Sequence, residues 1–95
     1  MQSTHPTTWR AVVALRIPRD GPDDLASCAR RRLEAPAGVD AATVTSVRRI
    51  EPALAATVVT VEATVDTTSD ADAAAIEACL KAAPGSQRVD SVERA

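Results

Sequence analysis

Apolar and polar residues alternate along two stretches of the chain, a pattern typical of half-buried β-strands. In residues 9–17 every second position is apolar, and Pro18 ends the run. Residues 57–65 repeat the pattern, with valines at alternate positions. The residues expected to share the buried face are Ala11, Val13, Leu15, Ile17, Val59, Val61, Ala63 and Val65. We therefore expect two neighbouring strands, each with one face in a hydrophobic core.

Two other segments carry apolar residues at the spacing of an amphipathic helix. For the first helix, we expect Asp20 or Gly21 as the N-cap and Pro22 as the first helical residue. For the second, Ser69 followed three residues later by Asp72 resembles a capping box. The expected buried stripes are Leu25, Cys28, Ala29 and Leu33 in the first helix, and Ile76, Cys79, Leu80 and Ala83 in the second.

The remaining segments predict two weaker strands. Residues 41–50 are rich in β-branched side chains but alternate poorly, which indicates an edge strand with a bulge. Residues 51–53 are read as a turn, and residues 87–93 as a short last strand. The order β-α-β-β-α-β predicts an α+β protein with a ferredoxin-like fold, in which two helices cover one face of a four-stranded antiparallel sheet. Residues 1–7 are expected to form a flexible tail before a single domain, residues 8–95.

In this arrangement the other sheet face is open, and it carries both apolar and charged side chains. Arg10 and Arg16 from the first strand face Glu62 from its neighbour. The first 50 residues carry a net charge of +3 and the rest −5, so opposite charges can pair across the strands. These three residues could be solvated cross-strand partners, part of a dimer face, or the lining of a pocket for an anionic ligand.

Composition excludes several chemistries that this fold class can support. The chain has no Phe, Tyr or Asn, and its single Trp9 is expected on the covered face, which argues against base stacking on the sheet. The only histidine, His5, lies in the expected tail, so no Ser-His-Asp or Cys-His arrangement and no metal cluster is predicted. A pI of about 5.3 argues against nucleic acid, despite the arginines at 30–32 and 48–49. No cofactor is predicted.

Cysteine usage and hydropathy point to a cytoplasmic protein. Cys28 and Cys79 are 51 positions apart and are expected to be small buried side chains, not a disulfide or a metal site. No segment predicts a signal peptide or a membrane span. The core is built mainly from Val, Ala, Ile and Leu, and its many alanines bury little area, which favours a homodimer.

The first strand and the loop after it, from Val12 to Leu25, resemble the start of ACT domains, small ligand-binding regulatory modules with the same order of elements. The family's loop reads Asp, one residue, Pro-Gly and a leucine, whereas this chain has Gly21-Pro22 in reversed order. The resemblance implies that a small anionic or amino-acid-like molecule binds at Arg19, Asp20 and Gly21, near a dimer interface.

Three functions are consistent with these observations. The first is a non-catalytic, small-molecule-binding or regulatory module that forms a homodimer. The second is a cofactor-free enzyme of the dimeric α+β barrel type, with Arg10, Arg16 and Glu62 around a pocket on the open face and Glu62 as general base. The third is an accessory subunit that binds another protein.

Overall fold

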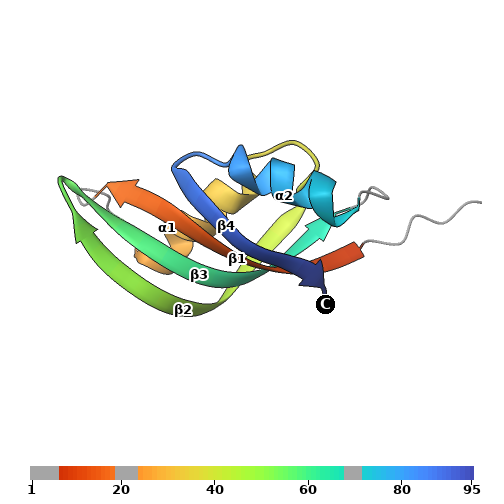
Figure 1. The fold of residues 1–95 in the computed structure, drawn as a ribbon, viewed down its shortest axis with the longest axis horizontal. Coiled ribbons are helices and arrows are strands. Elements are labelled where there is room, and N and C mark those ends of the chain that lie inside the picture. Colours follow the sequence, from red (N-terminus) through yellow and green to blue (C-terminus); the bar gives the residue numbers. More distant parts are fainter. Residues whose placement is uncertain (1–6, 19–23, 68–71) are drawn as a thin grey trace, which may run out of the picture.

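The computed structural model describes residues 7–18, 24–67 and 72–95, which form one sheet and two helices (Figure 1). The four antiparallel strands have the order β2-β3-β1-β4, so β1 and β3 are central and β2 and β4 lie at the edges, as predicted. This confirms the α+β class. The elements are β1 (Thr7–Pro18), α1 (Leu25–Glu34), β2 (Ala41–Ala53), β3 (Ala56–Thr67), α2 (Ala73–Lys81) and β4 (Ser86–Arg94).

The core lies between one face of the sheet and both helices. All eight strand residues expected on the buried face are at most 2% exposed, and Trp9 joins them. Leu33 of α1 and Leu80 of α2 belong to the same cluster. Of the predicted helix stripes, only Leu25 and Cys79 are half-buried, and the others are buried. The opposite face of the sheet is therefore the open face, as the alternation predicted.

Both helices begin later than predicted, because each is capped by an aspartate that follows the predicted N-cap in the sequence. The Asp24 carboxylate accepts a hydrogen bond of 2.7 Å from the Ser27 backbone N–H, so α1 starts at Leu25, and the predicted start at Asp20 to Pro22 is wrong. Asp72 accepts from the Ala75 N–H at 2.9 Å, so it is itself the cap that was assigned to Ser69. In each helix the carboxylate satisfies a backbone donor of the first turn.

The Asp24 cap predicts a pH dependence of stability. The hydrogen bond from the Ser27 backbone, and a second one from its side chain, hold the pKa of Asp24 below its ordinary value of 3.8. Because the pKa is lower in the folded state, this stabilisation is complete above about pH 4 and is lost as the pH falls through the lowered pKa. We expect the melting temperature of Asp24→Asn to fall less than that of the wild type below pH 4. Parallel falls in thermal scans from pH 7 to pH 2 would contradict this.

The β2 strand differs most from its prediction. It continues through Pro52 to Ala53, and the turn lies at Leu54 and Ala55, so the predicted turn at residues 51–53 is wrong. Proline is compatible with an edge strand, where its missing N–H leaves no ladder partner unpaired. Register shifts after Val44 and after Val47 confirm the predicted bulging of this edge. Each shift adds one residue, so Val44, Val47 and Ile50 reach the covered face at a spacing of three.

Candidate binding site on the open face of the sheet

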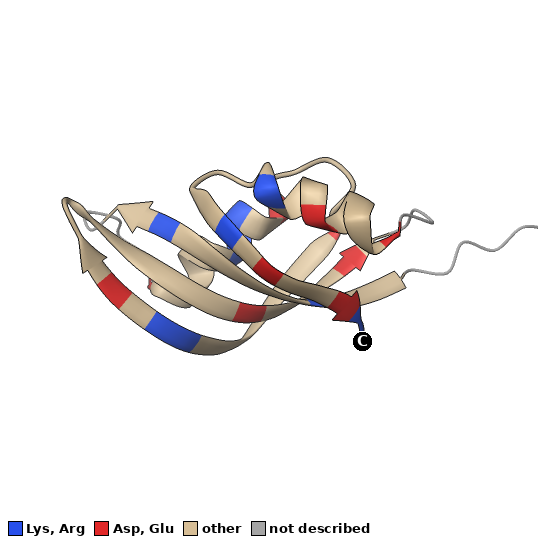
Figure 2. Ribbon diagram, in the orientation of Figure 1, with Lys and Arg blue, Asp and Glu red and all other residues tan. Residues whose placement is uncertain are grey.

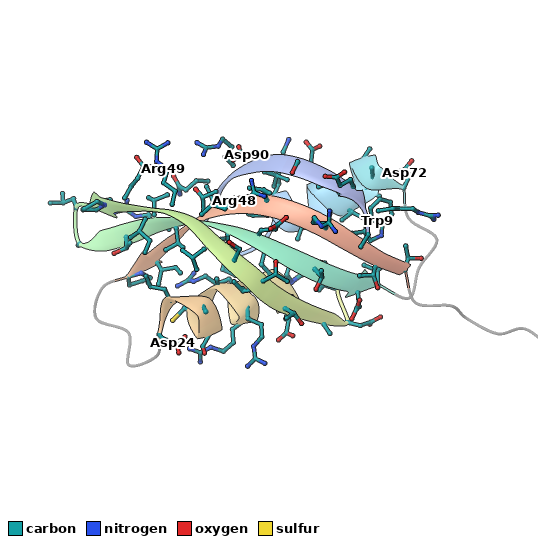
Figure 3. All side chains as sticks on the ribbon, turned by 90° about the horizontal axis from the view of Figure 1, so that it is seen from below. Trp9, Asp24, Arg48, Arg49, Asp72 and Asp90 are labelled. Atoms are coloured by element: carbon teal, nitrogen blue, oxygen red, sulfur yellow. The ribbon has the colours of Figure 1, made fainter. Side chains whose placement is uncertain are left out.

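Figure 2 marks the charged residues along the four strands. The strand register places most of them on the open face. Figure 3 labels the side chains of Arg48 and Arg49 on β2 and of Asp90 on β4. One row, given by the strand register, consists of Arg49 on β2, Thr60 on β3, Ala14 on β1 and Arg88 on β4. Two small central residues are thus flanked by an arginine from each edge strand.

Of the three open-face residues predicted to act together, two meet. The Arg10 Nε lies 3.9 Å from Glu62 Oε2, and Arg48 Nη2 lies 3.3 Å from the same oxygen. Arg48 was not predicted to take part. Arg16 is separate from this group, because its Nη2 donates a hydrogen bond of 2.7 Å to the carbonyl oxygen of Leu54 at the hairpin turn. Glu62 is therefore an ion-pair partner of two cations.

The centre of the open face is buried although the helices pack against the other side. Ala14 is 1% exposed and Thr60 is 6% exposed. Their neighbours in the same row are Arg49 and Arg88, whose long apolar stems can cover small residues while the guanidinium groups stay in water. Ala14 and Thr60 thus form a small floor between the two arginines.

Each of the two arginines that flank this floor forms an ion pair with an acidic residue of its own strand. Arg49 Nε lies 3.2 Å from Glu51 Oε1, and Arg88 donates to both carboxylate oxygens of Asp90. The hydrogen bond to Asp90 and the attraction of its charge raise the pKa of Arg88, against an opposing effect of desolvation. The charge of Glu51, on the other edge strand, is the smallest of the effects on this pKa.

Thr60 gives this floor an unusual property. Its hydroxyl oxygen is buried and has no hydrogen-bond partner among the residues that the structure describes. A buried hydroxyl without a partner costs about 1–3 kcal/mol, so folded proteins seldom keep one without a reason. Thr60 thus places an unused donor and acceptor beneath two arginine–acid pairs.

Four site residues on the edge strands were not predicted from the sequence, and one reason accounts for all of them. They are Arg49, Glu51, Arg88 and Asp90. Strict alternation assigns faces only while the register is regular, and β2 and β4 both contain shifts. Arg49 and Glu51 carry opposite charges two residues apart, and so do Arg88 and Asp90. This shared spacing was a signal that could have identified the site residues. On a strand such residues share a face.

The loop that resembles ACT domains cannot be placed, because Arg19, Asp20 and Gly21 lie outside the described residues. Within the described ranges, no group of three or more His, Cys, Asp or Glu residues could hold a metal ion. None of the helices in those ranges has the length and hydropathy needed to cross a membrane.

Comparison with known proteins adds no family to this description. No protein-family model, curated protein or solved structure matches the chain. The candidate site therefore depends on the geometry of the chain itself.

Proposed function

We propose that this protein is a non-catalytic module that binds a small molecule on the open face of its sheet. The observation that carries the proposal is the unpartnered, buried hydroxyl of Thr60 between Arg49 and Arg88. A ligand that reaches this floor gives the hydroxyl its missing hydrogen bond. Because each arginine stands beside an acid, the site suits a small ligand that carries a carboxylate and an ammonium group, as amino acids do.

We also propose a ferredoxin-like fold and a relationship to ACT domains for this chain. The split β-α-β order, with β1 and β3 central, supports the ferredoxin-like assignment. That arrangement also supports the ACT-like reading from the first loop. The enzyme alternative receives less support, because its general base, Glu62, is held between Arg10 and Arg48.

Self-association and a cytoplasmic location complete the proposal. Cys28 and Cys79 are not joined by a disulfide, which supports a reducing compartment. Seven alanines are buried among the described residues and contribute little area, and a second copy would add buried surface. Sedimentation at two protein concentrations tests the homodimer directly.

The decisive variant is Thr60→Val, with Thr64→Val as its control on the same strand and face. Without ligand, Thr60→Val should raise the free energy of unfolding by about 1 kcal/mol, because the unpaired hydroxyl is removed. In calorimetric titrations with amino acids, the same variant should bind about tenfold more weakly than the wild type. Thr64→Val should change neither quantity to this degree.

Arg88→Ala tests the charged part of the site, with Lys81→Ala on the other face as its control. We expect only Arg88→Ala to weaken binding. If Thr60→Val gains stability but keeps its affinity for every amino acid that the wild type binds, the open face is not the site. If the wild type binds none of the amino acids, the proposed ligand class is wrong.

A further inference from the structure

A hollow on the helix side of the molecule is separate from the open face. It has a volume of about 260 Å³ and lies between α1 and the turn that precedes β4. Among the described residues that line it, two are cationic and none is acidic. The lining consists of Cys28, Arg31, Arg32, Ala35 and Pro84.

Arg32 is held in place at the wall of this hollow. Its Nη1 donates a hydrogen bond of 3.2 Å to the carbonyl oxygen of Pro84, which links α1 to the turn before β4. The guanidinium group has five N–H donors, so this bond leaves most of them for a ligand. The side chain is half-buried, and a group that is already oriented loses less conformational entropy when it binds an anion.

Arg31 lies against the floor of the same hollow. Its Nη2 is 3.9 Å from the Sγ of Cys28, a residue that is only 9% exposed. The hollow thus has a small, weakly polar floor and guanidinium groups at its wall. Guanidinium groups bind oxyanions through pairs of parallel hydrogen bonds, which gives them a geometric preference for phosphate and carboxylate.

We propose that this hollow binds a tetrahedral oxyanion, with Arg32 as its main partner and Arg31 as the second. Its volume is below the roughly 300–1,000 Å³ of sites that enclose drug-sized ligands and leaves ample room for a phosphate-sized group. The site lies near the C-terminal end of α1, where the helix dipole opposes an anion. The arginines must offset this effect, and we therefore expect a dissociation constant in the millimolar range.

The test uses inorganic phosphate, titrated against the full chain by calorimetry at constant ionic strength. Arg32→Gln should weaken phosphate binding about tenfold or more, since a charge-assisted hydrogen-bonding group is lost. Arg30→Gln is the matched control: it removes the same charge from the same helix, but Arg30 does not line this hollow. It should change the dissociation constant less than about twofold, because an exposed charge outside the hollow is largely screened by salt.

A second variant is needed in case Arg32→Gln disturbs the turn. Ala35→Glu places a carboxylate in the hollow from an exposed position and leaves the Arg32 side chain intact. It should also abolish phosphate binding, with an unchanged circular dichroism spectrum. The site is refuted by equal losses in Arg30→Gln and Arg32→Gln, by binding that survives Ala35→Glu, or by a wild type that does not bind phosphate.

Two further measurements identify the source of the anion and its relation to the open face. A simple phosphate monoester that binds at least as tightly as inorganic phosphate supports a phosphorylated ligand, and weaker binding of the monoester supports a free ion. The Thr60→Val variant should bind phosphate like the wild type. Phosphate binding that is lost in Thr60→Val would overturn the assignment to the hollow.

Discussion

Replacement of Gly85 by alanine is expected to lower the free energy of unfolding by about 3 kcal/mol, with a fall in melting temperature on the order of 15 °C. Gly85 has a φ of +81°, in the region where a side chain costs about 1–2 kcal/mol. A Cβ atom there would also lie 2.5 Å from the backbone oxygen of Arg16. Neither backbone can move freely, because the Arg16 N–H donates to the Gly85 oxygen at 2.8 Å.

Gly38→Ala is the matched control for this prediction. Gly38 has a similar φ of +97°, but among the described residues a Cβ atom there would meet only the Cys79 Sγ, at an ordinary contact distance of 3.8 Å. The free energy of unfolding of the control should therefore fall only by the cost of the positive φ, about 1 kcal/mol. Urea unfolding, followed by the fluorescence of the buried Trp9, measures both variants. Equal losses would mean that the close approach of Gly85 to β1 contributes nothing.

The central strands could be predicted from the sequence because their register is regular. From Trp9 to Ile17 and from Val59 to Val65, every second side chain enters the core, so a period of two identifies both the strand and its buried face. In β2 the two bulges place Val44, Val47 and Ile50 on one face at intervals of three. That interval is closer to a helix than to a strand, so the pattern alone could not assign the faces.

The candidate site was predictable only in part for the same reason. Arg10 and Glu62 lie on regular strands, and their pairing followed from the alternation. Arg16 shares their face, but the hairpin turn provides a nearer acceptor, the Leu54 carbonyl oxygen, whose position no local pattern reveals. The unpartnered Thr60 hydroxyl is a property of the packed structure, because it depends on what four strands place around it.

Leu33→Ala tests the packing of α1 on the sheet and is expected to destabilise the protein by about 3 kcal/mol. Leu33 is fully buried and contacts a core whose only aromatic side chain is Trp9. Removal of its isobutyl group takes away apolar contacts and leaves a cavity that the β-branched residues around it fill poorly. For a chain of 95 residues, this loss is a large fraction of a total stability of about 5–14 kcal/mol.

Leu54→Ala makes the same chemical change at the hairpin turn, where the side chain is 90% exposed. It should change the free energy of unfolding by less than about 0.5 kcal/mol. The contact between Arg16 and the Leu54 carbonyl oxygen involves the backbone, so the substitution leaves it in place. The contrast between the two variants in urea unfolding measures how much burial contributes at Leu33. A small loss in Leu33→Ala would mean that α1 does not pack on the sheet in solution, and a large loss in Leu54→Ala would mean that the hairpin turn is covered there.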